Sequence, residues 1–139
     1  MGRRDNHFNI APRRAISPVS VADNTPAVSE VIDMDGFESL EFVIAVGSVA
    51  DADATFAVLV EDADEAAFNV TNAAVADGFL LGTEAGAAFK FDSDNTVKKI
   101  GYRGNKRYCR MTVTPTGNAS AALMSVVAIL GHPHIAPTA

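Results

Sequence analysis

Apolar and polar residues alternate with a period of two along much of this sequence, and that pattern restricts the chain to folds built from β-strands. The clearest case is SLEFVIAVG, in which one face carries four apolar residues, Leu40, Phe42, Ile44 and Val46. A second case is TFAVLVE, in which Phe56, Val58 and Val60 recur in the same way. Because successive side chains of a strand point to opposite faces, each set predicts one strand with a buried face.

Weaker versions of the pattern predict further strands at residues 28–33, 97–102, 107–114 and 122–130. The last of these is apolar on both faces, which is typical of a central strand. Proline cannot donate to a strand ladder, so Pro133 and Pro137 predict that this strand ends before GHPHIAPTA. We expect one core that draws on most of the strands, with Leu40, Phe42, Ile44, Phe56, Val58, Val113, Val126 and Ile129 as members.

Residues 62–95 show no clear period. Their alanines permit a short helix at 66–76, whereas Asn69, Val70, Thr71 and Asn72 argue against a long one. We interpret this segment as a long, partly extended excursion with turns at Asp77–Gly78 and Asp94–Asn95.

About eight short strands without a sustained helical pattern predict an all-β fold: a single-domain β-sandwich, jelly-roll-like, or a small barrel. The predicted domain spans residues 15–139, and residues 1–14 form an extended N-terminal arm because they lack periodicity. A chain of 139 residues is long enough to form a stable core without covalent cross-links, and its single cysteine, Cys109, allows no internal disulfide. The longest apolar run, AALMSVVAIL, is about half the length of a membrane span, so no membrane partner is expected.

Charge is distributed unevenly along the chain, whose net charge is −6. Residues 15–89 contain no Lys or Arg but fourteen Asp and Glu, while the basic residues lie in the arm and at 90–110. This asymmetry predicts two electrostatic faces suited to docking, although a solvated acidic face explains it equally well.

The arm combines four arginines with two apolar residues, and we expect it to bind a partner. Guanidinium groups suit bidentate pairing with carboxylates, and a segment this polar buries too little to order by itself. The candidate partner-binding residues are Arg3, Arg4, Phe8, Ile10, Arg13 and Arg14. We expect the arm to be mobile in the free protein and to order on assembly, so that deleting it leaves the melting temperature unchanged. The alternative is a tail without a role.

The stretch KKIGYRGNKRYCRMTVTP, residues 98–115, raises the question of nucleic-acid binding because six of its first thirteen residues are basic. An RNA-recognition module would place an aromatic, Gly-rich strand within a βαββαβ chain, and that order is missing here. A β-hairpin explains the stretch better, with Gly104–Asn105 in a tight turn that needs left-handed residues. We expect Tyr102 and Tyr108 to pack their rings while their hydroxyls stay near polar groups.

No other motif predicts chemistry. The acidic stretches DMDG, DADA and EDADE lack the spacing of a calcium loop and are interpreted as turns. His132 and His134 stand without a third metal ligand nearby, and Cys109 has no mark of a nucleophile. We therefore expect neither an enzyme, nor a cofactor, nor a metal site.

Five phrases in a fixed order, between residues 28 and 137, resemble the small head-decoration, or cement, proteins of tailed bacteriophages. They are IDMDGFESLEFVIAVGS, DADATFAVLVEDAD, FLLGTEA, KKIGYRGNKRYCRMTVTP and ILGHPHIAP. The resemblance implies a β-sandwich that sits on the outer capsid surface and stabilises the lattice of the major capsid protein. It also implies that the fourth of these segments, KKIGYRGNKRYCRMTVTP, contains a structural signature, whose residues are Gly101, Tyr102, Gly104, Lys106, Arg107 and Tyr108.

The expected function is therefore that of a structural virion protein, made in the host cytoplasm and located on the capsid surface. Its expected partners are the major capsid protein and further copies of itself, as trimers near local three-fold positions, without direct binding of nucleic acid. Two alternatives remain open: a tail or head–tail joining protein, and a nucleic-acid-binding β-domain.

Overall fold

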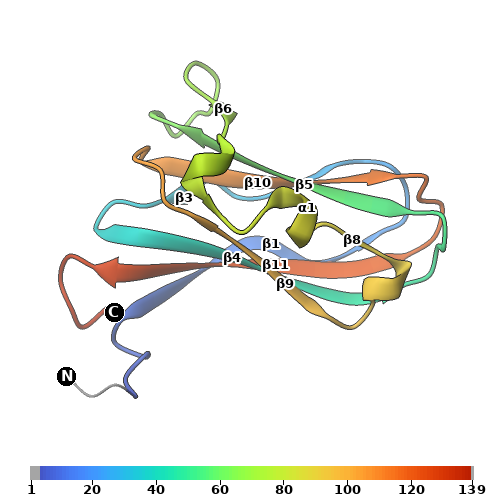
Figure 1. Cartoon of the computed structure of the whole chain (residues 1–139), viewed down its shortest axis with the longest axis horizontal. Helices are drawn as coiled ribbons and strands as arrows, with labels where there is room; N and C mark the ends of the chain where they lie inside the picture. Colours follow the sequence, from blue (N-terminus) through green and yellow to red (C-terminus); the bar gives the residue numbers. More distant parts are fainter. Residues whose placement is uncertain (1–3, 139) are drawn as a thin grey trace.

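The computed structural model describes residues 4–138 and shows two antiparallel sheets packed face to face, with short helical segments at their margin (Figure 1). Sheet A has the strand order β1 (Ile10–Val21), β11 (Ala122–Pro133), β4 (Phe37–Val49), β9 (Val97–Tyr102) and β7 (Leu80–Leu81). Sheet B has the order β2 (Ala27–Val28), β10 (Tyr108–Thr116), β5 (Thr55–Ala63) and β6 (Ala73–Ala74). Two further strands extend sheet B, with β3 (Ile32–Asp33) on β10 and β8 (Phe89–Lys90) on β5. The predicted all-β sandwich is confirmed.

The core lies between the sheets and consists of every second side chain of the long strands. Pairs in register fill it from sheet A, for example Phe42 opposite Ile100, and from sheet B, for example Val113 opposite Val58. Of the eight predicted core residues, only Ile129 is wrong, because its neighbours Ala128 and Leu130 are the buried ones. Residues 122–130 are apolar on both faces, so the pattern alone could not choose the face that packs inward.

β1 begins inside the segment that we expected to be an arm. Ile10 pairs with Gly131 and Arg14 with Val127, so the sheet starts before the predicted boundary at residue 15. The inward-pointing residues here are Ala11 and Ala15, both fully buried but too small to mark a core face in the sequence. The prolines of β1 are tolerated because it is the edge strand of sheet A.

Two strand predictions differ from the structure in extent. The predicted strand 28–33 is divided into β2 and β3, and the intervening Glu30 donates its N–H to the Ala15 carbonyl of β1 at 2.8 Å. β11 continues through His132 to Pro133, beyond the predicted end, with Pro133 opposite Phe37 of β4. Pro133 is tolerated there because β1 reaches only to Gly131, which leaves one side of β11 open.

The middle of the chain, residues 62–95, runs along the edge formed by β5 and β9. Within 66–76 the structure has no helix, only the short strand β6. The predicted turn at Asp77–Gly78 lies within a short 3-10 helix, η1 (Asp77–Phe79), and the one at Asp94–Asn95 follows a second, η2 (Phe91–Ser93). The one α-helix of the described chain is α1 (Glu84–Ala87). Glu84 of α1 accepts the N–H of Val60 at 2.8 Å, which satisfies part of the free edge of β5.

The predicted hairpin at 98–114 is wrong. Both strands exist, but β9 belongs to sheet A and β10 to sheet B, so residues 103–107 cross from one sheet to the other. We call this connection the 103–107 arch. The alternation of apolar and polar residues indicates which side chains are buried, but it does not show whether two consecutive strands belong to the same sheet. The hairpin was predicted because strands that follow one another in sequence usually pair.

Candidate partner-binding surfaces

Tyr102 closes one end of the sandwich beneath the 103–107 arch. Its ring is buried, and its hydroxyl donates to Asp62 Oδ2 of β5 at 2.7 Å while accepting the Lys106 N–H at 3.1 Å. Burial, reinforced by the hydrogen bond to Asp62, raises the pKa of Tyr102 far above its usual value, so the phenol stays protonated. One side chain from sheet A thereby ties sheet B and the arch together.

Gly104 allows the arch to pass close over the Tyr102 ring. A Cβ at Gly104 would lie 2.3 Å from the hydroxyl oxygen of Tyr102 and 2.4 Å from Cζ. Its φ is not positive, so the reason for glycine here is lack of space and not the left-handed turn that the hairpin prediction assumed. Tyr102 packs its ring in the core with its hydroxyl on a polar partner, as predicted. Tyr108 lies on the outward face of β10, opposite to that of the buried Cys109, and is only partly buried.

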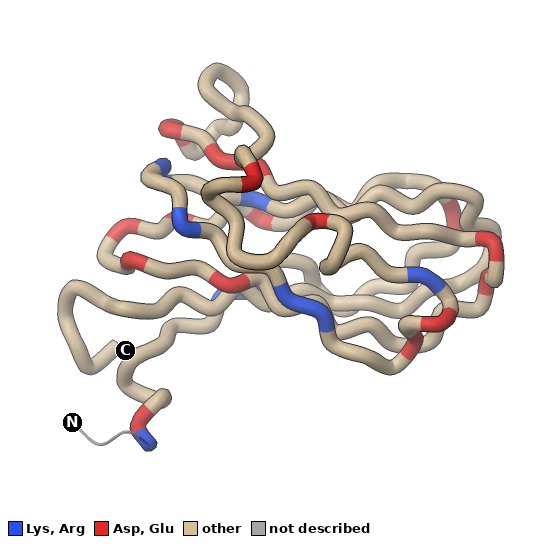
Figure 2. Tube along the Cα trace, in the orientation of Figure 1, with Lys and Arg blue, Asp and Glu red and all other residues tan. Residues whose placement is uncertain are grey.

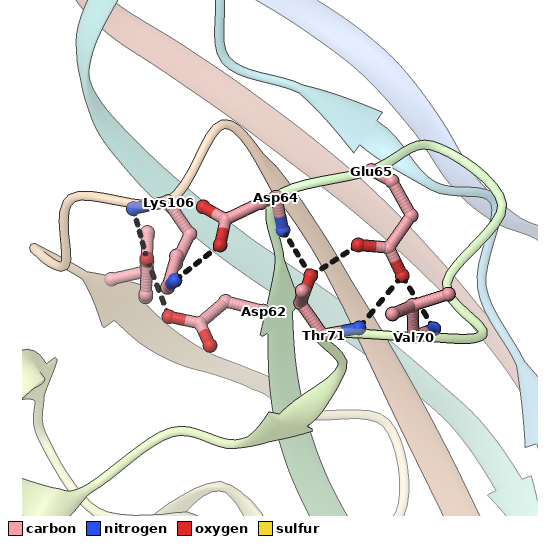
Figure 3. Close-up of polar contacts among 7 residues, drawn as sticks. Asp62, Asp64, Glu65, Val70, Thr71 and Lys106 are labelled. Carbon is pink, nitrogen blue, oxygen red and sulfur yellow. Dashed lines mark hydrogen bonds and ion pairs between the residues drawn. The ribbon is translucent and has the colours of Figure 1, made fainter.

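Basic and acidic positions lie close together along the backbone at the end of the sandwich that carries the arch (Figure 2). Three of the basic side chains there, Lys106, Arg107 and Arg110, form ion pairs within the chain, while Arg103 donates to the Gly78 carbonyl at 3.1 Å. Arg107 binds Asp33 through two hydrogen bonds of 2.9 and 3.0 Å, and this pairing lowers the pKa of Asp33. Lys106 Nζ lies 2.5 Å from Asp64 Oδ2 (Figure 3), and Arg110 Nε lies 3.1 Å from Glu61 Oε1. These pairs neutralise much of the positive charge that suggested a nucleic-acid site.

A loop of residues 64–72, which we call the 64–72 loop, is organised around one carboxylate (Figure 3). Glu65 Oε1 accepts the N–H groups of Asn69, Val70 and Thr71 at 2.7–3.0 Å, and Glu65 Oε2 accepts the Thr71 hydroxyl. The hydrogen bonds from Thr71, followed by those from the other N–H groups, lower the pKa of Glu65 to about 2. The loop is therefore held in one shape at neutral pH.

The candidate arm residues are distributed around one corner of the sandwich. Arg3 lies outside the described residues. Arg4 and Arg13 are exposed, Phe8 is 48% exposed, and Ile10 is partly buried at the start of β1. Arg14 is exposed and lies 3.4 Å from Glu30.

The segment before β1 is attached to the other end of the chain. Thr138 donates its N–H to the Phe8 carbonyl at 2.9 Å and its hydroxyl to the Ile10 carbonyl at 2.7 Å. Residues 8–14 thus have backbone partners on the same molecule, which the expectation of a mobile arm did not foresee.

The outward face of sheet A is largely apolar, and sequence reasoning missed it as a site. Register places Val127 beside Val43, and Ala45 beside Val97, on the face opposite to the core. The exposed fractions of the large members are considerable: Leu81 50%, Val97 66%, Leu123 48% and Val127 41%. A shallow hollow of about 420 Å³ lies at one end, lined by Pro18, Ala45, Gly47 and Leu123. One feature of the sequence could have indicated this apolar face: residues 122–130 are apolar on both faces of their strand.

Three charged side chains lie on this face: Arg14 on the edge strand β1, Lys99 on β9, and Glu41 on the central strand β4. Arg14 lies beside Val127 on the edge strand, and Lys99 lies beside Val43. Glu41 lies next to Gly101, and a Cβ at Gly101 would come within 2.5 Å of the Glu41 carboxylate. Partial burial raises the pKa of Glu41. Gly101 thus leaves room for a carboxylate on the outward face.

The other sequence candidates serve local structure. Asp33 and Asp51 each accept the N–H of the residue two positions later, at 3.0 and 2.9 Å, as turn carboxylates do. His132 Nδ1 lies 3.0 Å from Ser39 Oγ, and His134 Nε2 lies 2.5 Å from Glu38 Oε1. Within residues 4–138, no three or more His, Cys, Asp or Glu side chains gather as metal ligands would. No helix in this part of the chain is long and apolar enough to cross a membrane.

Comparisons with known proteins yield only weak matches to solved structures. No protein-family model matches the sequence, and no curated protein is significantly similar to it. One solved structure similar to this chain is the CBM22-1-GH10 part of xylanase 10B from Clostridium thermocellum, with a TM-score of 0.46 and 11% identity over 96% of this chain and 28% of the other. Another is a family two carbohydrate esterase from Cellvibrio japonicus, with a TM-score of 0.38 and 7% identity over 94% of this chain and 36% of the other. The chain thus spans about a third of each or less, and similarity at this level carries no argument about function.

Proposed function

We propose that this chain is a structural protein of the virus particle, a decoration or cement protein that binds the outer surface of a bacteriophage head. The resemblance of its ordered phrases to that protein class supports the proposal. The observation that carries it in the structure is the apolar outward face of sheet A, because contiguous exposed apolar surface on a soluble domain marks a site of protein association.

Binding would be adhesive. Fully burying a valine or leucine side chain is worth about 1.5–3 kcal/mol, so a face carrying Val43, Leu123 and Val127 supplies substantial affinity once water is excluded. Arg14 and Lys99 at the margins of this face would then select a partner surface with acidic groups nearby. Each contact is repeated over every copy on the particle, so a modest affinity per site stabilises the whole shell.

The test is co-sedimentation of the purified protein with heads that were assembled without it. Val127→Asp places a carboxylate in the centre of the outward face of sheet A, and we expect it to weaken head binding at least tenfold, since about 1.4 kcal/mol corresponds to that factor. Thr114→Asp is the matched control, because Thr114 is an exposed strand residue on the outward face of sheet B. Equal binding by both variants, with unchanged melting temperatures, would reject the proposed face.

A tail or head–tail joining protein is the second candidate, and the same adhesive face would serve it. The two differ in copy number, which quantitative mass spectrometry of purified particles measures. Hundreds of copies agree with decoration of the shell, whereas a handful points to a ring at one vertex.

Nucleic-acid binding is the third candidate, and the intramolecular ion pairs of Lys106, Arg107 and Arg110 argue against it. A phosphate backbone would have to displace Asp64, Asp33 and Glu61 from these side chains. Titration with labelled DNA tests this, and an affinity that falls steeply with added salt would favour a phosphate-binding surface.

A further inference from the structure

The 64–72 loop is a projection whose shape is fixed before any partner arrives. Its backbone is held by Glu65, and Phe68 adopts a φ of 55°, which is unusual for a residue other than glycine. The Phe68 ring is buried beneath the Arg110 guanidinium, 4.4 Å from the ring centre. Strained backbone that is maintained by several surrounding contacts occurs preferentially at binding sites.

This loop presents an apolar side chain to solvent. Val70 is 80% exposed, although the loop around it is ordered by hydrogen bonds on both sides. Figure 1 shows the loop extending beyond sheet B next to β6. Residues 66–76 carry no charge, whereas Asp64 and Glu65 stand at the base of the loop. The loop therefore offers an uncharged tip with acidic groups behind it.

A complementary groove lies at the opposite edge of the sandwich. It separates β1 of sheet A from β2 of sheet B, has a volume of about 600 Å³, and we call it the β1–β2 groove. Apolar side chains line it, among them Ile16, Val19 and Val28, of which Val28 is 54% exposed. Arg14 and Glu30 lie at one end of it, and Arg13 adjoins them.

Position and charge both indicate that the loop and the groove meet between two copies. In the strand orders of the sheets, β1 and β2 are at one edge and β6 and β7 at the other, so one molecule cannot join its own loop to its own groove. Two arginines against one glutamate leave positive charge at the end of the groove. Asp64 and Glu65, against Lys106, leave negative charge at the base of the loop. Opposite excess charge favours the contact.

We propose that the 64–72 loop of one copy inserts Val70 into the β1–β2 groove of a second copy. The contact is heterologous, because the two surfaces differ, and each pair of copies keeps one free loop and one free groove. Such contacts close into rings or continue as rows. The inference goes beyond attachment to a head. Arg14 and Val19 lie at the border between the groove and the outward face of sheet A, whereas Val43, Leu123 and Val127 of that face take no part in the contact.

The experiment is sedimentation velocity of the full chain across a concentration series, with two variants that each damage one surface. Val70→Lys brings a cation toward Arg13 and Arg14, and Val28→Glu brings an anion toward the acidic base of the loop. We expect the unmodified chain to associate as concentration rises, and each variant alone to associate at least tenfold more weakly. Ile135→Lys is the matched control, because Ile135 is 83% exposed in the C-terminal segment, and it should associate like the unmodified chain.

Mixing the two variants makes the test specific. The Val28→Glu chain keeps an intact loop and the Val70→Lys chain an intact groove, so an equimolar mixture should recover association that neither variant shows alone. A mixture that stays monomeric overturns the proposal, as does an unmodified chain that remains monomeric at about 1 mM. Unchanged association by either variant alone would overturn it too. Circular dichroism and melting temperature establish that each variant is folded.

Discussion

At the scale of single residues, Gly104 shows how a position can require glycine for want of space. Gly104→Ala would place a methyl group against the Tyr102 ring, so either the ring or the arch has to move. Overpacking of this kind costs about 1–3 kcal/mol, and we expect that loss in the free energy of unfolding measured by urea denaturation. Gly78→Ala is the control, since nothing lies within 4 Å of a Cβ there. Equal stability of both variants would mean that the arch is not tightly packed.

Tyr102 is the second residue whose role is open to a direct test. Tyr102→Phe keeps the buried ring but removes the hydroxyl, which leaves Asp62 and the Lys106 N–H without this partner. These two groups are partly buried, so the free energy of unfolding should fall by about 1 kcal/mol, the net worth of a typical intramolecular hydrogen bond. Tyr108→Phe serves as the control because Tyr108 is only partly buried, and a comparable loss there would contradict the role assigned to the Tyr102 hydroxyl.

At the scale of elements, the 64–72 loop should respond to acid. The Glu65 pKa lies near 2 in the folded chain against an ordinary 4.5, so its contribution to stability is fully present above pH 4.5 and declines as pH falls toward 2. We expect the Val70 and Thr71 amides to be protected from hydrogen exchange at neutral pH and to lose protection below pH 4. Glu65→Ala should remove the protection at every pH, whereas Glu30→Ala should not. Protection independent of Glu65 would show that other contacts order the loop.

β1 carries the second prediction at this scale. Deletion of residues 1–14 removes the pairs from Ile10–Gly131 to Arg14–Val127 and uncovers the core beside Ala11. We therefore expect the melting temperature to drop, contrary to the expectation that followed from a free arm. A chain lacking only residues 1–7 keeps all of β1 and should melt like the full chain. If both truncations melt normally, the N-terminal half of β1 contributes little to stability.

These elements also show which parts of the fold the sequence could reveal. β4, β5, β9 and β10 were predicted closely, because large apolar residues alternate with polar ones and one face is buried. The start of β1 was not predicted, because its buried residues are the alanines Ala11 and Ala15, which are too small to mark a core face in the sequence. The arch was not either, because the decisive contact, Tyr102 with Asp62, joins residues forty positions apart. Contacts of that range depend on the three-dimensional arrangement of the sheets and leave no local pattern.

At the scale of the whole molecule, the candidate surfaces were the least predictable part. Val43 and Val127 each lie in an apolar run, and only the register of β4 and β11 shows that they are neighbours facing away from the core. The role of Glu65 as the centre of a loop was hidden in an acidic stretch that was interpreted as a turn. The arm, in contrast, was conspicuous in sequence because it is arginine-rich, and the structure gives part of it an ordinary place in a sheet.

The hydrogen bonds of Thr138 to Phe8 and Ile10 bring the last described residue of the chain beside the start of β1 (Figure 1). A circular permutant, in which the strands occur in a different order along the chain, should therefore fold into the same structure. Joining the two ends of this chain by a short glycine–serine linker and opening it between the exposed residues Ser120 and Ala121 should give a protein with the same far-ultraviolet spectrum. For the same reason, peptides attached at Phe8 and at Thr138 would leave the domain from neighbouring points on its surface.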